Sequence, residues 1–447
     1  MMNIHFIGIG GIGMSALAQY FLNRGAAVFG SDLVDGEMIK LLRQKGARVK
    51  IGQPRAGNIN RNIDLVIYTS AVAKNNPELL AAKKRKITTQ SYAQALGRLT
   101  KEMTTVAVAG MHGKSTTTAM LAVAAVAAGL DPTVILGTRL PEFGGSNFRA
   151  GRSNLLIIEA DEYKAALLRF YPDVAVVLNI DREHLDFYRG LEHIKKTFRR
   201  FLSQLKPGGA AILNRDDQNL KTLLPASFWR TGGGTLKWFS IYDQEVDKIK
   251  KVLKVPGRHN LSNALAVYQT LRFLGVSSKK ILAGIGKFKG SWRRLEYKGQ
   301  VNGAKIYDDY GHHPTEIKAT IQAAREILKA NKLKAKSSQA NKLWLVFQPH
   351  QYKRTHQLFT DFRAAFSGAD EVLLLDIYSV AGRESAAIKR RISTAKLVRA
   401  INRKNIHYVP SFSRAVTILK QSLQPGDLCL IMGAGDVWRA TLLLTKK

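Results

Sequence analysis

The chain has 447 residues, enough for about two to four domains with cores of their own. Its composition, 45% hydrophobic and 23% charged, is ordinary for a globular protein, and no apolar run reaches the roughly 18 residues of a membrane span. Lysine and arginine number 69 against 33 aspartate and glutamate, a formal net charge of +36. The basic residues are dispersed and no nucleic-acid-binding motif accompanies them, so we interpret them as a solvated surface without a specific nucleic-acid partner.

The beginning of the chain and its cysteine content indicate a compartment. The first residues, MMNIHFIGIGG, show no basic stretch or cleavage site of a signal peptide. The single cysteine, Cys429, has no partner for an internal disulfide and lies in an apolar run, so we expect it in a core. We therefore expect a cytoplasmic protein, and the sequence leaves open whether it is a monomer or a homodimer.

The first hundred residues alternate between strands and helices around a glycine-rich turn. The turn Gly8-Ile9-Gly10-Gly11-Ile12-Gly13 follows a strand and opens into a helix that we expect to reach Ala26. Glycines at this spacing let a backbone approach a diphosphate, and an acidic residue about 20 positions on suits a ribose hydroxyl. Asp32 has that position, and Ser70 ends a later strand; both are candidate ligand contacts. The pattern fits a UDP-linked ligand as well as NAD. We expect strands at Asn3–Ile7, Ala27–Gly30 and Asp64–Tyr68.

Residues 104–120, TTVAVAGMHGKSTTTAM, are the segment with the clearest chemistry. An apolar strand, Val106–Ala109, leads through a short glycine turn into a helix over Thr116–Val126. In such an arrangement backbone N–H groups and the helix N-terminus face a polyphosphate, Lys114 adds a positive charge, and the Ser115 hydroxyl can hold Mg²⁺. The turn is shorter than the usual nucleotide loop, and Val108 stands in this chain at the position of that loop's first glycine. We predict an ATP site with Gly110, His112, Gly113, Lys114, Ser115 and Thr116 as its contacts.

Acidic side chains follow two later strands of this central part. The strand Leu155–Ile158 ends in Glu159, and the strand Val174–Asn179 leads to a loop that holds His184. Carboxylates just beyond strand ends, downstream of a phosphate loop, suit Mg²⁺. Glu159 is the stronger metal candidate, because a lone histidine such as His184 more often packs or caps a loop.

Two asparagines, Asn260 and Asn263, precede an expected helix over Ala264–Leu274. Their spacing of three allows both to face one ligand, such as an adenine edge. Without further context, a helix cap and a surface asparagine explain them more simply.

The last part, from about residue 291, alternates in the same way. A strand pair around Tyr297–Ile306 is followed by DDYGHHPTE, with His312 and His313 in the loop before a helix that reaches about Leu328. No cysteine or helical histidine pair supports a zinc site there. The basic segment Lys329–Lys342 predicts a solvated loop. Further strands are expected at Leu343–Phe347, Val372–Asp376 and Leu428–Met432.

The motifs GIGGIGMSALA, AGMHGKSTTTAM, EADE, NIDREHLDFY, GRHNLSNA, WRRLE, DDYGHHPTE, FQPHQYKRT and MGAGD occur in this order. Together they resemble the Mur ligases of peptidoglycan synthesis, most closely the branch that adds L-alanine to UDP-N-acetylmuramate. The resemblance implies a three-domain α/β fold, with a Rossmann-like UDP-binding domain at 1–100, a central P-loop ATPase-like domain at 101–290 and a Rossmann-like domain at 291–447. It also implies a ligase that uses ATP and Mg²⁺: the sugar-nucleotide carboxylate attacks the γ-phosphate, and the L-alanine amine then attacks the acyl phosphate.

The resemblance implies a role for each matching residue. Lys114 would hold the β- and γ-phosphates, Ser115 and Glu159 would bind Mg²⁺, and His184 would ligate or orient a second Mg²⁺. The remaining roles are adenine contacts from Asn260 and Asn263, phosphate contact from Arg294, ribose contact from Asp309, carboxylate binding by His313 and Arg354, and diphosphate binding by Gly8, Gly10, Gly11, Ile12 and Gly13.

Some positions depart from the family pattern. Met111 and Ser115 stand where threonine is usual, and Gln351 replaces an arginine of some members, which leaves the second carboxylate contact open. Phe198 aligns with the carbamylated lysine of other branches, as expected for the alanine-adding branch. The preference among alanine, glycine and serine is not fixed by the sequence.

Three alternatives remain. A ligase that attaches a whole tripeptide to the same sugar nucleotide has a related sequence after Glu162, which here continues with Tyr163-Lys164. An NAD(P)-dependent oxidoreductase would explain only the first glycine turn. A nucleic-acid-binding ATPase would rest on the net charge.

Overall fold

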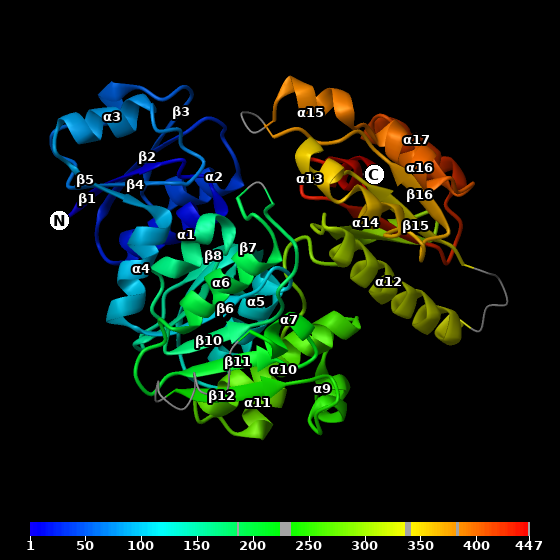
Figure 1. The fold of residues 1–447 in the computed structure, drawn as a ribbon, viewed down its shortest axis with the longest axis horizontal. Helices are drawn as coiled ribbons and strands as arrows, with labels where there is room; N and C mark the ends of the chain where they lie inside the picture. Colours follow the sequence, from blue (N-terminus) through cyan, green and yellow to red (C-terminus); the bar gives the residue numbers. More distant parts are fainter. Residues whose placement is uncertain (186, 224–233, 336–340, 381–383, 446–447) are drawn as a thin grey trace. The chain divides into compact units, whose positions relative to one another are not determined.

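The computed structural model describes residues 1–447 except 186, 224–233, 336–340, 381–383 and 446–447. The chain divides into two compact units, Met1–Val252 with Ser262–Phe288, and Leu253–Leu261 with Lys289–Lys447. The first unit contains two sheets and the second unit contains one (Figure 1). The expected three-part α/β architecture is confirmed. Among the helices that the structure describes, none combines the length and apolarity needed to cross a membrane.

The first sheet has five parallel strands in the order β3-β2-β1-β4-β5. The order reverses between β1 and β4, so the carboxyl end of β1 is a switch point, where open α/β sheets bind ligands. Asn76 caps α3 and a capping box formed by Ser91 and Gln94 starts α4. The elements are β1 (Asn3–Ile7), α1 (Ile12–Asn23), β2 (Ala27–Asp32), α2 (Glu37–Gln44), β3 (Arg48–Ile51), η1 (Ala56–Asn58), β4 (Leu65–Tyr68), α3 (Pro77–Lys84), β5 (Thr88–Ser91) and α4 (Tyr92–Glu102).

The central sheet has seven strands in the order β12-β11-β10-β6-β9-β7-β8, parallel except for the β7–β8 pair. Its middle strand, β6, is apolar and buried along most of its length, as expected at the centre of a parallel sheet. The helix that follows it, α5, is buried over most of its length as well. The strands are β6 (Thr104–Ala109), β7 (Thr133–Leu140), β8 (Ser146–Arg149), β9 (Leu155–Glu159), β10 (Val174–Val177), β11 (Ala210–Asn214) and β12 (Thr235–Phe239), and the helices are α5 (Lys114–Ala127), η2 (Pro141–Phe143), η3 (Tyr163–Arg169), α6 (Leu191–Leu202), α7 (Gln218–Lys221), α9 (Val246–Val252), α10 (Arg258–Phe273) and α11 (Ser278–Ile285).

Buried polar contacts join these two sheets. In α1, which follows the first glycine turn, Gln19 donates to the Asn147 Oδ1 atom of β8 at 2.8 Å and accepts from Ser146 Oγ at 3.0 Å. Asn147 is fully buried and donates to Ser15 Oγ at 2.9 Å. A buried amide that keeps its partners fixes the packing geometry, because any shift would leave polar atoms unpaired. The first glycine turn is therefore held firmly against the central sheet.

The sheet of the second unit has six strands in the order β13-β14-β18-β15-β16-β17, parallel except for β13. Cys429 in β18 is fully buried, as predicted. The elements are β13 (Glu296–Val301), β14 (Ala304–Asp309), α12 (Pro314–Ala335), β15 (Leu343–Phe347), α13 (Tyr352–Gln357), α14 (Phe359–Arg363), β16 (Glu371–Leu374), α15 (Ala386–Arg391), α16 (Thr394–Ile401), β17 (Ile406–Tyr408), α17 (Phe412–Ser422), β18 (Leu428–Met432) and α18 (Trp438–Thr445).

Several predicted boundaries were wrong. Helix α1 ends at Asn23 instead of Ala26, because Gly25 adopts a φ of +79°. Helix α10 already begins at Arg258, directly after Gly257 at φ +100°, so both candidate asparagines are helical. Of the predicted loop Lys329–Lys342, residues 329–335 continue α12, since alanine and lysine are good helix formers. Residues 336–340 lie outside the described part of the chain.

Candidate functional site

The phosphate loop of the first unit is built by two glycines with positive φ. Gly110 leaves β6 at φ +138°, and Gly113 caps α5 at φ +84°, conformations that other residues rarely adopt. The Asn263 side chain packs directly against this turn, since a Cβ on Gly113 would lie 2.8 Å from Asn263 Oδ1. The loop and one of the two candidate asparagines are therefore adjacent.

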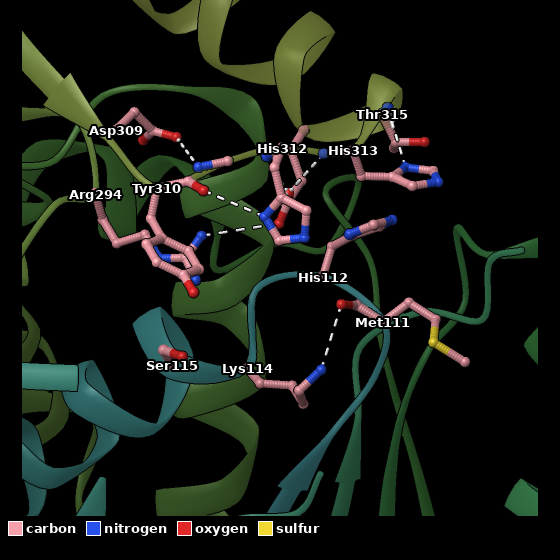
Figure 2. A network of polar contacts seen from close by, with 12 residues as sticks. Met111, His112, Lys114, Ser115, Arg294, Asp309, Tyr310, His312, His313 and Thr315 are labelled. Carbon is pink, nitrogen blue, oxygen red and sulfur yellow. Dashed lines mark hydrogen bonds and ion pairs between the residues drawn. The ribbon is translucent and has the colours of Figure 1, made fainter. Parts of the chain in front are cut away.

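Lys114 is the first residue of α5, and its ammonium turns back into the loop. The Nζ atom donates to the Gly110 carbonyl at 2.7 Å and, as Figure 2 shows, to the Met111 carbonyl, at 3.3 Å. It also forms an ion pair with Glu162 Oε2 at 2.7 Å. Burial works against the ammonium form, but the negative charges of Glu162, Asp161 and Glu159 outweigh it and raise the pKa of Lys114. The lysine is thus a permanent cation at the N-terminus of a helix.

Ser115 and Glu159 meet beside this lysine. Glu159 ends β9, and the Ser115 hydroxyl lies 3.1 and 2.9 Å from its two carboxylate oxygens. Gly137 makes room for this carboxylate, because a Cβ there would lie 2.2 Å from Glu159 Oε2. A hydroxyl and a carboxylate are the oxygen donors that Mg²⁺ prefers, so the pair fits such an ion.

His184, the third predicted metal ligand, has a different partner. Its Nε2 atom lies 3.1 Å from Glu162 Oε1, and its φ is +53°. One ligand atom each from Asp161, Glu162 and His184 lies within 4.8 Å of the others, close enough to share a cation. Burial lowers the pKa of His184, but its hydrogen bond and charge contact with Glu162 raise it more.

The other loop residues are held by the chain's own polar groups. His112 Nε2 lies 3.0 Å from Asp181 Oδ2, and the His112 backbone nitrogen donates to Asn179 Oδ1 at 2.9 Å. Thr116, in the first turn of α5, is buried. Asn179 therefore ties the loop to the segment that follows β10.

In the first sheet, Asp32 closes the glycine turn. Its Oδ2 atom accepts the backbone N–H of Gly10 at 2.8 Å, and the Gly8 N–H donates to the Ser31 carbonyl. Gly11 precedes α1, so the N–H groups of its first turn are available to an anion. Ser70 follows β4, and its carbonyl accepts from Lys164 Nζ at 3.1 Å. The remaining predicted contacts of this turn are Ile12 and Gly13, the first two residues of α1.

In the second unit, Arg294 and Asp309 lie at the β13–β14 end. Arg294 packs over the Tyr310 ring, and its Nη1 atom is 3.8 Å from Glu316 Oε1. Asp309 is buried and accepts the N–H groups of Leu295 at 2.8 Å and Gly311 at 2.7 Å. Burial raises the pKa of Asp309 to about 6, although Arg294 and both backbone donors oppose the shift.

The histidine loop of the second unit is organised by Glu316 in α12. Its Oε2 atom accepts the backbone N–H groups of His312 at 2.9 Å and His313 at 3.1 Å. His313 is buried, and its Nδ1 atom accepts the Thr315 N–H (Figure 2). Both histidines precede α12, as predicted.

Arg354 and Asn260 are the remaining candidates of the second unit. Arg354 Nη1 lies 3.2 Å from His350 Nδ1, and His350 stacks on Tyr378. The Asn260 amide donates to the Pro256 carbonyl at 2.6 Å. Asn260 is buried in the first turn of α10, and this bond ties it to the segment just before the helix.

Two departures from the family pattern have clear structural settings. Phe198 is fully buried in α6 and offers no ligand atom, while Lys195 beside it pairs with Glu192 at 3.2 Å. Gln351 precedes α13 at φ +72°.

Three carboxylates organise these groups without having been predicted to do so: Glu162, Glu316 and Glu384. Glu384 accepts the N–H groups of Tyr352 and Lys353 at the start of α13. Glu162 and Glu316 stand in the EADE and DDYGHHPTE motifs, and this position was the sequence signal that could have identified them. No motif marks Glu384.

Three family models match successive parts of the chain: "Mur ligase family, catalytic domain" at 3–104, "Mur ligase middle domain" at 108–271 and "Mur ligase, glutamate ligase domain" at 293–435. A UDP-N-acetylmuramate–L-alanine ligase of Clostridium acetobutylicum is 40% identical over 98% of this chain and 96% of its own length. The enzyme of the same name from Acetivibrio thermocellus is 39% identical over 99% and 96%. The crystal structure of the Thermotoga maritima UDP-N-acetylmuramate–alanine ligase aligns with a TM-score of 0.78 at 25% identity, covering 99% of this chain and 98% of that one.

Proposed function

The chain belongs to the Mur ligase family, and we propose that it uses ATP to join L-alanine to the carboxylate of UDP-N-acetylmuramate, a step of cytoplasmic peptidoglycan precursor synthesis. The observation that carries the proposal is the full-length similarity, at 40% identity, to a ligase of that name. We also propose the division into domains at 1–100, 101–290 and 291–447.

The reaction has two chemical steps. A carboxylate oxygen of UDP-N-acetylmuramate attacks the γ-phosphorus of ATP, the bond to the β-phosphate oxygen breaks, and ADP leaves. The alanine amine then attacks the acyl carbon, inorganic phosphate leaves, and the amine loses a proton. Both steps develop negative charge on phosphate oxygens, so fixed cations and N–H donors supply most of the catalysis.

In the first unit, Lys114 and the N–H groups at the start of α5 bind the β- and γ-phosphates. We assign Ser115 and Glu159 to Mg²⁺, with His184 at a second ion; bound there, Mg²⁺ would neutralise phosphate charge. The glycine turn after β1 binds the UDP diphosphate, with Asp32 and Ser70 beside it, and Asn263 contacts the adenine.

In the second unit, Asp309 binds the ribose and Arg294 binds phosphate oxygens, while Asn260 contacts the adenine. We assign His313 and Arg354 to the carboxylate of the amino acid. A buried histidine and an arginine are donors suited to that group.

The direct test is ADP release with ATP, Mg²⁺ and UDP-N-acetylmuramate, with L-alanine or the L-alanyl-D-glutamyl-diamino acid tripeptide in parallel. We expect turnover with free L-alanine. Turnover with the tripeptide alone would assign the chain to the recycling branch, and silence with both would refute the proposed substrates.

Nucleotide binding is expected to weaken as the pH falls through about 6. The pKa of Asp309 is raised from its usual 3.8 to about 6, so the side chain takes up a proton as the pH falls through that value. The protonated group is a poorer hydrogen-bond acceptor for the ribose hydroxyl. The Kd of ADP should therefore rise between pH 7.5 and pH 5, with a midpoint near 6. In an Asp309→Asn variant this pH-dependent step should vanish; its persistence would assign the step to another group.

A further inference from the structure

Glu162 is fully buried and bridges two groups of the ATP site. Its two carboxylate oxygens go to different partners: Oε2 lies 2.7 Å from Lys114 Nζ, and Oε1 lies 3.1 Å from His184 Nε2. Lys114 begins α5, whereas His184 lies in the loop beyond β10. One side chain therefore joins groups from two distant segments.

This bridge is a demanding arrangement. A carboxylate buried without a cation is costly, and an ammonium at a helix N-terminus is repelled by the helix dipole. Burial raises the pKa of Glu162, but Lys114 and His184 together lower it, so the residue remains an anion. The opposite charges of Glu162 and Lys114 therefore offset the free-energy cost of burying each of them.

The bridge also fixes where the Lys114 ammonium points. The ammonium donates hydrogen bonds to the carbonyls of Gly110 and Met111 and forms an ion pair with Glu162, so Nζ is held within the loop. Figure 2 shows its bond to the Met111 carbonyl. A free lysine chain would instead sample many rotamers, and ordering it on ligand binding costs free energy. Fixing the ammonium in advance removes that cost.

The segment that carries Glu162 is itself constrained. Lys164 and Ala165, two and three residues later, adopt φ values of +53° and +56°. The Tyr188 hydroxyl donates to the Glu162 carbonyl. Backbone held in such conformations is typical of functional sites, where the surroundings over-determine it.

We propose that Glu162 is a positioning residue, which holds Lys114 and His184 in place to receive the triphosphate of ATP. The inference rests on the proposed function for the identity of the ligand, and it acts through Lys114 without contact between Glu162 and the nucleotide.

The test measures binding of a non-hydrolysable ATP analogue, AMP-PCP, by calorimetry in a double-mutant cycle. The four proteins are wild type, Glu162→Gln, Lys114→Met and the double variant, all full length. Glutamine keeps the shape of Glu162 and removes its charge. We expect Glu162→Gln to raise the Kd of AMP-PCP about tenfold, the effect of one charge-assisted contact. In the Lys114→Met background the same change should have less than about a twofold effect.

A matched control is Glu78→Gln in the first sheet. Glu78 is also fully buried, faces His5 at 3.7 Å and accepts from Ser31 Oγ at 2.6 Å, but none of these contacts involves the phosphate loop. This variant should lower the melting temperature and leave the Kd of AMP-PCP unchanged.

Three results would overturn the proposal: an unchanged Kd in Glu162→Gln, tighter binding, which would make Glu162 a competitor for Lys114, or an equal loss in the Lys114→Met background. Because AMP-PCP does not react, the outcome is separate from the acceptor test. Failure of wild type to bind AMP-PCP would refute the proposed function itself.

Discussion

Replacing Lys114 by methionine is expected to lower kcat for ADP release by about a thousandfold or more, equivalent to about 4 kcal/mol of transition-state stabilisation. Lys114 is the buried cation that the loop carbonyls and Glu162 direct at the phosphate position. Methionine fills a similar volume but supplies no charge. The measurement is steady-state ADP release at saturating ATP, UDP-N-acetylmuramate and L-alanine.

The control for this variant is Lys84→Met, which removes an exposed lysine from the last turn of α3. It should keep wild-type kcat. Removing Lys114 also leaves the buried Glu162 with His184 as its remaining ion-pair partner, so circular dichroism and a melting curve must show that the variant is folded at the assay temperature. A folded Lys114→Met protein that retains a tenth of wild-type kcat would contradict the role assigned to Lys114.

The phosphate loop could be predicted because its information is local. An apolar strand, two glycines and the Lys114-Ser115 pair stand within ten residues, and each has a direct backbone or charge reason. The structure places the strand end, the two positive φ angles and the helix start where that pattern requires. The carboxylate at the end of β9 followed from the same reasoning, because Glu159 ends a buried strand.

The partners of these residues could not be predicted in the same way. Nothing in the sequence states that Glu162 rather than Glu159 contacts His184, since both glutamates stand in the same four-residue motif. That choice depends on the left-handed turn after Glu162 and on the path of the loop after β10. Contacts between segments far apart in sequence are set by the packed fold.

The predicted ends of two helices, α10 and α12, were wrong for a different reason. The segment after Leu328 was judged by its charge, and charge alone does not distinguish a solvated helix from a solvated loop. The alanines among those lysines continue α12 to Ala335. In α10, the sequence predicts a helix from Ala264 onward, yet of the preceding GRHNLSN motif only the glycine lies outside the helix.

Replacing Asp308 by asparagine is expected to destabilise the second unit by about 3–5 kcal/mol. Asp308 and Arg293 are each 2% exposed, and Arg293 Nε lies 3.1 and 3.2 Å from the two carboxylate oxygens. The Arg293 Nη2 atom also donates to the Gly433 carbonyl at 2.6 Å, which ties β14 to the loop after β18. Without Asp308 the guanidinium stays charged and buried with carbonyl partners alone.

The converse variant, Arg293→Met, should be less harmful. Burial raises the pKa of Asp308, and once Arg293, which opposes that shift, is removed, the carboxyl can take up a proton and become neutral. A guanidinium has no such escape, because it does not deprotonate in proteins. The measurement is tryptophan fluorescence during urea unfolding, since three of the chain's five tryptophans, Trp292, Trp344 and Trp438, lie in this unit. An Asp308→Asn protein that unfolds at the same urea concentration as wild type, or a larger loss in Arg293→Met, would show that the pair does not hold β14 in place.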